Sequence, residues 1–429
     1  MSVGLTSMRG CLTGLCFGAL LGCGPSGQSL GAQGSGGAGS GEVCLGGECG
    51  ARTQVHAGSS HTCATTAAGA VRCWGSSAWG LGYGDENDIG DDEAPASAGD
   101  VDVGGRVAQL AVGGHHTCAL LEGGTVRCWG LGLRGSLGYA NAIYIGDDEA
   151  PASAGDVDVG GRVVQIAAGS TRTCALLDDG ALRCWGAIRR QIDGNWEVIG
   201  DDETPASVGD VDVGGKVVEV AVGVDHICAL LDGGAVRCWG DASQGQLGYG
   251  NKNDIGDDET PASAGDVDVG GEVVQIAAGH SNTCAVLLGG GLRCWGFAGR
   301  TGYGTTDNVG DDETPASVGD VDVGGKVLQV SVGLDHACVL LETGAVRCWG
   351  LSAALGYGDT TNRMLPGGDV RIGGPVVQIT AGYRHTCAVL ERGAVRCWGV
   401  GDDGRLGYGN TDMIGDDEDP ASAGDVPYL

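Results

Sequence analysis

Seven pairs of cysteines, each with its two members ten positions apart, are the residues best suited to chemistry in this chain. Such a pair could form a disulfide or supply two ligands to a zinc ion. A structural zinc ion needs four ligands, and one pair offers two. We therefore predict seven disulfides and no metal site. The predicted pairs are Cys63–Cys73, Cys118–Cys128, Cys174–Cys184, Cys228–Cys238, Cys284–Cys294, Cys338–Cys348 and Cys387–Cys397.

A glycine at a fixed position between the cysteines indicates how each pair is held. Gly124, for example, would end a three-residue hairpin loop, at the left-handed position that glycine adopts most easily. This register places Cys118 opposite Cys128 and Leu120 opposite Val126 in two antiparallel strands. The cysteines then form a non-hydrogen-bonded pair with Cα atoms roughly 4.5 Å apart, a distance that suits a disulfide.

Histidines and acidic turns also recur, and each could bind an ion or act in catalysis. A histidine precedes the first cysteine by two positions in five units: His61, His116, His226, His336 and His385. Catalysis needs one asymmetric group of residues rather than copies, so we predict a hydrogen-bonding role for these histidines. The acidic turns lack the regular spacing of a known calcium loop, and we predict that they are solvated. They are 91–93, 147–149, 201–203, 257–259, 311–313 and 416–418.

The elements that position these residues repeat about every 54 residues over 51–429. Each unit contains four short apolar stretches, for example "VVQIAAG", "HTCALL", "AVRCWG" and "DVDV". We predict four strands per unit, with each "DVDV" joined to the next "VVQI" by a tight glycine turn. Repeated antiparallel sheets arranged around an axis form a β-propeller. The last residues, 425–429, should pair beside 53–57 and complete the first blade.

The repeated pattern resembles that of the regulator of chromosome condensation family. The resemblance rests on Gly113, His116, Gly124, Trp129 and the segment "LGYG" at 247–250. It implies an all-β, seven-bladed propeller covering all seven units. Units 3 and 5 depart from the pattern, with Arg172 and Asn282 in place of the histidine, and unit 6 has "RMLPGGDV" in place of the acidic turn.

The amino terminus has the layout of a secretory signal. Residues 1–22 contain Arg9, a short apolar stretch and small residues, and they end at Cys23 in a context that resembles the lipobox of bacterial lipoproteins. We predict a signal peptide over 1–22, lipid attachment at Cys23 and a flexible linker over 23–50. Cys44 and Cys49 should pair within that linker, which leaves no unpaired cysteine in an oxidising compartment.

Charge and loop variation limit the function. The formal net charge of −31 argues against nucleic acid as a partner. We expect no cofactor, a monomer, and an extracytoplasmic protein anchored by lipid to a bacterial membrane, the outer one by preference. A constant frame with variable loops is typical of a binding scaffold for a protein or glycan. The candidate contact residues are Trp79, Arg134, Tyr144, Arg189, Arg190, Trp196 and Arg300.

Two alternative functions remain open from the sequence. One is an enzyme, such as a hydrolase or lyase, with its site in the propeller channel. The other follows from the resemblance, which implies guanine-nucleotide exchange in eukaryotic members of the family. The signal segment, the cysteines and the acidic charge argue against that second function, and a shared fold does not carry function with it.

Overall fold

The computed structural model describes residues 53–188, 191–192, 195–196, 198–351 and 354–428. The predicted signal peptide at 1–22, the lipid-bearing Cys23, the linker at 23–50 and the Cys44–Cys49 pair lie outside the described residues. Within the described part, no helix is both long enough and apolar enough to cross a membrane.

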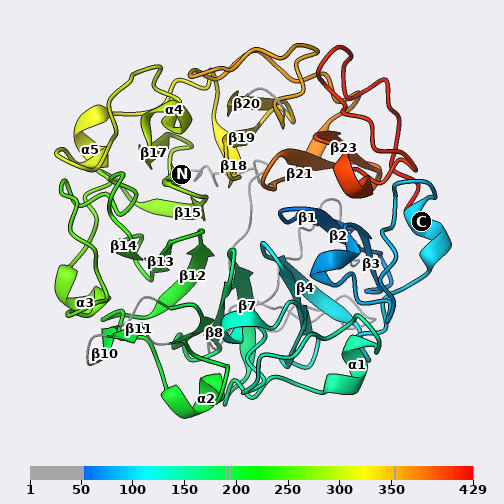
Figure 1. Cartoon of the computed structure of the whole chain (residues 1–429). Coiled ribbons are helices and arrows are strands. Elements are labelled where there is room, and N and C mark those ends of the chain that lie inside the picture. Colours follow the sequence, from blue (N-terminus) through cyan, green and yellow to red (C-terminus); the bar gives the residue numbers. More distant parts are fainter. Residues whose placement is uncertain (1–52, 189–190, 193–194, 197, 352–353, 429) are drawn as a thin grey trace, which may run out of the picture.

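Seven three-stranded antiparallel sheets surround a central axis and form a seven-bladed propeller (Figure 1). Blade 1 is β1(Gln54–Ala57), β2(His61–Thr65) and β3(Val71–Gly75). Blades 2 to 4 are β4(Val107–Val112), β5(His116–Leu121), β6(Val126–Gly130); β7(Val163–Ala168), β8(Arg172–Leu177), β9(Leu182–Gly186); β12(Val217–Val222), β13(His226–Leu231), β14(Val236–Gly240). Blades 5 to 7 are β15(Val273–Ala278), β16(Asn282–Leu287), β17(Leu292–Gly296); β18(Val327–Val332), β19(His336–Leu341), β20(Val346–Gly350); β21(Val376–Ala381), β22(His385–Leu390), β23(Val395–Gly399).

In five of the described units, a short helix lies at the periphery, where the unit passes from its variable loop to its "DVDV" segment (Figure 1). Proline at the first helical position favours these turns, because its missing N–H needs no partner there. They are η2(Pro95–Ala98), α1(Pro151–Ala154), α2(Pro205–Val208), α3(Pro261–Ala264) and α5(Pro315–Val318). The variable loops contain η1(Ser77–Trp79), η3(Leu133–Gly135), β10(Gln191–Ile192), β11(Asn195–Trp196), α4(Ala298–Thr301) and η5(Asp402–Gly404).

The predicted hairpin register is confirmed. Cys118 lies opposite Cys128 and Leu120 opposite Val126, and Gly124 adopts a φ of 84°. All seven repeat pairs are disulfide-bonded, with Cα atoms 4.0–4.1 Å apart. The tryptophan after each second cysteine is buried in the core, as expected for a large side chain that packs between blades.

The prediction of four strands per unit is wrong. The first valine of each "DVDV" segment makes a single ladder-like bond to the third strand of its own unit, as Val157 N–H does to the Val126 carbonyl at 2.8 Å. The segment then leaves that strand and crosses to the next blade. There Arg183, on β9, donates its Nη1–H to the Val159 carbonyl and its Nε–H to Asp210 at 2.9 Å. The "DVDV" segment therefore lies in the seam between blades and does not form a hairpin with the following strand.

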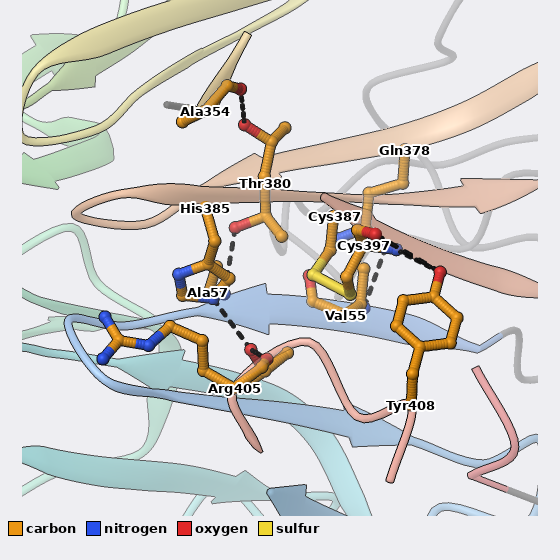
Figure 2. Close-up of a disulfide and its surroundings, with 12 residues drawn as sticks. Val55, Ala57, Ala354, Gln378, Thr380, His385, Cys387, Cys397, Arg405 and Tyr408 are labelled. Atoms are coloured by element: carbon orange, nitrogen blue, oxygen red, sulfur yellow. Dashed lines mark hydrogen bonds between the residues drawn. A yellow bond between two sulfur atoms is a disulfide. The ribbon is translucent and has the colours of Figure 1, made fainter. Parts of the chain in front are cut away.

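The ring closes between blade 7 and blade 1 through side chains. Gln378 of β21 accepts the Val55 N–H at 3.2 Å and donates to the Val55 carbonyl at 3.1 Å (Figure 2). Thr380 accepts the Ala57 N–H at 3.1 Å. The first strands of blades 7 and 1 are therefore joined in the same way as those of neighbouring blades.

The prediction that 425–429 pairs as a strand beside 53–57 is wrong. Val426 bonds to Val395 of its own blade at 2.8 Å, and Arg72 of blade 1 donates to the Tyr428 carbonyl. The tail thus occupies the seam position that "DVDV" occupies elsewhere. Within residues 425–428, the hydrogen bond to the predicted segment is a side-chain bond of 2.9 Å between the Tyr428 hydroxyl and Thr53.

Candidate binding face

The variable loops and the turns from first to second strands share one face of the propeller, which we call the loop face. In blade 2, β4 ends and β5 begins there, and Gly130 at the end of β6 lies opposite His116. The variable loop 131–144 follows Gly130 directly. Residues that differ between units therefore gather on one side of a nearly constant frame.

Three variable loops are each anchored to the next blade by a backbone carbonyl that accepts two bonds. The Ser136 carbonyl of the second loop accepts the Trp185 indole N–H at 3.0 Å and the Thr173 hydroxyl at 3.1 Å, both from blade 3. The Gln246 and Ala354 carbonyls accept equivalent pairs of bonds in blades 5 and 7. These bonds fix the base of each loop while its outer residues remain free to vary.

The repeated histidines connect neighbouring blades in five of the seven seams. The Nε2 atom of each lies 2.7–2.9 Å from a threonine hydroxyl of the next blade. The pairs are His61–Thr117, His116–Thr173, His226–Thr283, His336–Thr386 and His385–Thr62. The predicted hydrogen-bonding role is correct, and the partner lies in the adjacent blade.

The direction of these bonds fixes the protonation state of the histidines. The Thr173 hydroxyl donates to the Ser136 carbonyl, so it must accept from Nε2–H of His116. The Nδ1 atom, which has no hydrogen-bond partner among the described residues, then carries no proton. Burial lowers the pKa of His116 to about 3, with smaller contributions from neighbouring histidines. The histidine is therefore neutral and unsuited to proton transfer at neutral pH.

Two seams use an ion pair instead. In the seam between blades 3 and 4, Arg172 pairs with Asp225 at 3.4 Å. In the seam between blades 5 and 6, Arg300 pairs with Asp335. The threonine is missing from these two seams as well, since Ile227 and Ala337 stand in its place.

A small cavity opens at the centre of the loop face. It has a volume of about 80 Å³ and is lined by the glycine that follows each first strand, by the residue before that glycine and, in six blades, by the residue after it. Each glycine packs against the carbonyl oxygen of the next one around the ring, where a Cβ atom would overlap it. The glycines are Gly58, Gly113, Gly169, Gly223, Gly279, Gly333 and Gly382.

The residues at the rim of this cavity differ from blade to blade. Ser170, Val224, His280, Leu334 and Tyr383 occupy equivalent positions. We call this part of the loop face the axial mouth: the ring of seven glycines together with the residue that follows each of them. It was not predicted from the sequence. The available signal was the pair of variable residues between a constant glycine and the histidine position, as in "GSSHTC", "GHSNTC" and "GYRHTC".

The predicted contact residues fall in different places. Arg134 in η3 is exposed, and Tyr144 is half-buried with its hydroxyl bonded to the Ala78 carbonyl at 3.2 Å. Arg300 lies in a seam, with 14% of its side chain exposed, so it is not a free surface contact. Trp79 belongs to η1 and Trp196 to β11, but their side chains lie outside the described part. Arg189 and Arg190 also lie outside the described residues.

A second feature missed from the sequence is a set of glutamines between the first strands. Gln109 accepts the Ile166 N–H of the next blade at 2.9 Å, and Gln165 accepts that of Val220 at 3.1 Å. These side chains cover the inner edge of each sheet, which would otherwise leave its N–H groups unpaired at the channel. Glu219 takes this position in blade 4 and accepts the Ile276 N–H at 3.3 Å.

The acidic turns bring three carboxylates together at the outer flank. In five of them, the oxygens of the two aspartates and the glutamate lie within 4.8 Å of one another. The pKa of each glutamate is raised, to about 7 for Glu203, mainly by burial and then by contact with the neighbouring aspartate. Glu93 and Glu418 each accept the N–H of the glycine three residues earlier, which shows that the turn has a structural role.

Comparison with known proteins agrees with this geometry. The chain matches the RCC1-like domain family over residues 81–424. It is 31% identical to the ultraviolet-B receptor UVR8 of Arabidopsis thaliana over 73% of this chain and 68% of that protein. It is 29% identical to human E3 ubiquitin-protein ligase HERC2 over 58% of this chain, but spans only 5% of HERC2.

Solved structures share the fold. The yeast RCC1 protein Prp20 bound to Kap60 superimposes with a TM-score of 0.65 at 22% identity, covering 82% of this chain and 83% of the yeast chain. A second structure of Prp20p from Saccharomyces cerevisiae gives 0.63 at 21% identity, covering 85% and 86%. The family match, the identity with UVR8 and the seven blades lead to one conclusion: this chain belongs to the RCC1-like domain family.

Proposed function

We propose that this protein is a non-enzymatic scaffold that binds a protein partner on its loop face. The observation that carries the proposal is the contrast between constant and variable parts. All seven blades have the same type of disulfide-bonded hairpin, whereas the loops anchored to them differ in sequence. Rigidly anchored variable loops are how scaffolds usually present a binding surface.

The second loop has the composition of a contact surface. Leu133 and Ile143 are 55% and 63% exposed, and Arg134 is exposed beside Leu133. Large apolar side chains next to arginine are typical of the centre of a protein interface. Loop 131–144 is therefore the part of the loop face where we expect the strongest contribution to binding.

Relatives support a protein partner. Prp20p of yeast binds Gsp1p and histones, and yeast RCC1 has been crystallised with Kap60. The ligase activity in the name of HERC2 gives no support for an enzyme here, because this chain spans 5% of that protein. We propose that this propeller, like those of its relatives, binds a protein. We do not propose that it binds any of the partners of those relatives.

A loop exchange tests the proposal. Loops 131–144 and 241–254 have the same length and lie between equivalent "CWG" and "IGDD" segments. Replacing 131–144 with the sequence of 241–254 should abolish capture of the partner from envelope extracts, and the fold should be unchanged by thermal unfolding. The reverse exchange, at 241–254, is the matched control. Equal recovery of partners by both variants and the unaltered chain would contradict the proposal.

We also propose that the protein is anchored at the bacterial envelope through Cys23. The seven disulfides favour an oxidising compartment, and Cys23 follows an apolar segment in a lipobox-like context. Cys23→Ser should shift the protein from the membrane fraction to the soluble fraction or block its processing. Unchanged fractionation, with no lipid mass on the mature amino terminus, would contradict the anchor.

A further inference from the structure

We propose that the axial mouth binds a carboxylate group. The mouth is the cavity of about 80 Å³ at the centre of the loop face, and Ser170, His280 and Tyr383 line it from blades 3, 5 and 7. This inference rests on the proposed function for its place on the binding face, and it adds the chemistry of the ligand. A volume of this size admits a small polar group and excludes a larger ring.

The polar side chains of the mouth are hydrogen-bond donors. Nη1 of Arg300 lies 3.5 Å from Nδ1 of His280, and a guanidinium can only donate, so Nδ1 accepts. The proton of a neutral His280 is then on Nε2. Burial raises the pKa of Tyr383; the interaction of its hydroxyl with Ser170, on the opposite side of the axis, opposes this shift by a smaller amount, and the charge of Asp225 adds to it. Tyr383 therefore remains protonated at neutral pH and can donate to a ligand.

Two arginines donate hydrogen bonds to backbone carbonyls of residues in the mouth. Arg172 donates to the Val224 carbonyl at 2.7 Å, and Arg405 donates to the Ser59 carbonyl at 3.1 Å. Each is also paired with an aspartate, so these groups add little net charge. Arg384, which directly follows Tyr383, is exposed and does not itself line the cavity. Its position next to a lining residue adds a positive charge at the rim of the mouth, as a carboxylate needs.

The acidic turns do not prevent this binding. They lie before the helices at the periphery, as α1, α2, α3 and α5 show in Figure 1, and not around the axis. Charges exposed to solvent are screened beyond about 8 Å at physiological salt. The mouth therefore combines donors from three blades with an exposed arginine, at a distance from the acidic turns. Asp225, whose charge acts on Tyr383, is paired with Arg172 at 3.4 Å.

Acetate, with acetamide as its neutral equivalent, tests the ligand chemistry on the full-length chain. In NMR spectra of histidine-labelled protein, the ring signal of His280 is the one that disappears in His280→Gln. Its chemical shift should change with acetate concentration and reach saturation. We expect a dissociation constant of about 1–10 mM, because acetate offers few atoms for contact. Equal shifts with acetate and acetamide, or no saturable shift up to about 100 mM acetate, would overturn the proposal.

Variants locate the site and separate binding from folding. Arg384→Gln and Tyr383→Phe should each weaken acetate binding at least about fivefold, since each removes a donor from the ligand. Arg162→Gln changes an exposed arginine at the start of β7, on the opposite face, and should leave binding unchanged. Thermal unfolding of all three should match the unaltered chain. Equal weakening by Arg162→Gln would show a non-specific charge effect and overturn the assignment.

The carboxylate could belong to a free small acid or to a side chain of the partner. If the double change Tyr383→Phe with Arg384→Gln also weakens partner capture, the partner supplies the carboxylate. If capture is unchanged while acetate binding is lost, the ligand is a free acid. Loss of capture on exchange of 131–144, without acetate binding, would uphold the proposed function and overturn this inference. Acetate binding in a chain that captures no partner would uphold this inference and overturn the proposed function.

Discussion

Individual residues at the seams show that the repeats vary as interacting pairs. Five seams use histidine and threonine, and the two seams that lack the histidine also lack the threonine. Arg172 with Asp225 and Arg300 with Asp335 take their place. An unpaired buried histidine or threonine would cost about 1–3 kcal/mol, which explains why both members change together.

Glu219 provides the first prediction at this scale. The other six units have glutamine at this position. Its amide can both accept and donate a hydrogen bond, as Gln275 does, and a carboxyl group can do so only when protonated. Burial raises the pKa of Glu219 from 4.5 to about 8. Because this folded-state value lies above the unfolded one, stability is lost as pH rises from 4.5 towards 8. Glu219→Gln should therefore stabilise the protein at pH 7, by at most about 3 kcal/mol.

Urea unfolding at several pH values measures this effect. The gain from Glu219→Gln should be small near pH 4.5 and should grow up to pH 8. Gln165→Glu is the matched control, because it places the same carboxyl group in a neighbouring seam and should introduce the same loss of stability with rising pH. A gain that is independent of pH would mean that the Glu219 carboxyl group does not titrate in the seam.

The buried histidines predict the opposite dependence on pH. Burial lowers the pKa of His61, His116 and His226 from 6.5 to about 3. The folded-state value lies below the unfolded one, so stability is complete above pH 6.5 and is lost as pH falls towards 3. His116→Gln removes one such group, so the variant should lose about 2 kcal/mol less than the unaltered chain between pH 7 and pH 4.5. Parallel pH curves for the two proteins would rule this out.

Among the elements, the hairpins were predictable and the seams were not. The position of Gly124 and the spacing of Cys118 and Cys128 fix the register of β5 and β6, because both depend on residues close in sequence. The path of "DVDV" depends on a guanidinium about 24 residues away, as for Val159 and Arg183. Strand propensity alone therefore suggested a fourth strand where the structure has a single backbone bond and a side-chain contact.

The axial mouth could not be located from the sequence for a related reason. Its residues are adjacent only because seven first strands meet around one axis, and Ser170 and Tyr383 are far apart in the chain. The variable loops were visible as unlike segments between constant ones. Variation at two positions per unit was too short a signal to separate from neutral change without the geometry.

The degree to which each hairpin shields its disulfide from solvent predicts which disulfide is reduced first. In six blades a tyrosine hydroxyl covers the backbone of the second cysteine, as Tyr249 does for Cys238 at 3.2 Å, and blade 3 has no such tyrosine. Cys184 is 6% exposed, whereas the other repeat cysteines are fully buried. Brief reduction of the native protein, followed by alkylation and peptide mapping, should label Cys174 and Cys184 first, roughly tenfold faster than the other pairs.

A variant in blade 4 checks the cause. Tyr249→Ala removes the equivalent hydroxyl and should raise the reduction rate of Cys228–Cys238 to that of Cys174–Cys184. The other five disulfides should react as before, because each of their blades has its own tyrosine. Uniform labelling of all seven pairs in the unaltered chain would show that reduction follows global unfolding and not local protection.

The whole molecule depends on a closing seam that differs from the other six. Every other seam is crossed by continuous chain. Blade 7 meets blade 1 through side chains, through the tail and through backbone bonds such as that from the Tyr383 N–H to the Gly58 carbonyl at 3.0 Å. Gln378, Thr380 and His385 of blade 7 contact β1 and β2 (Figure 2). Tyr428 fills the remaining space, packing on Trp74 with ring centroids 6.1 Å apart. The ends of the chain were expected to complete each other, and they do so by packing rather than strand pairing.

Tyr428→Ala should therefore destabilise the entire ring. The side chain is 1% exposed, and replacing a buried aromatic residue by alanine costs about 3–5 kcal/mol. Tyr428→Phe, which loses only the hydroxyl bonds to Thr53 and Gly393, should cost about 1 kcal/mol. Val159→Ala at the equivalent position of a continuous seam is the matched control, with an expected cost of about 2 kcal/mol. Thermal unfolding would rank the three variants.

Hydrogen exchange separates ring opening from a local cavity. In Tyr428→Ala, the amides of β1 and β2 should lose protection together with those of β21 and β22, because opening the closing seam exposes both sides of it. In Val159→Ala, the chain still connects blades 2 and 3, so loss of protection should remain near Val159. Normal protection of β1 in Tyr428→Ala, despite lower stability, would show that the tail fills a cavity without closing the ring. If instead both sides of the seam open together, the segment 424–428 holds a seven-bladed structure closed, and exposure of the inner strand edges would lead to aggregation.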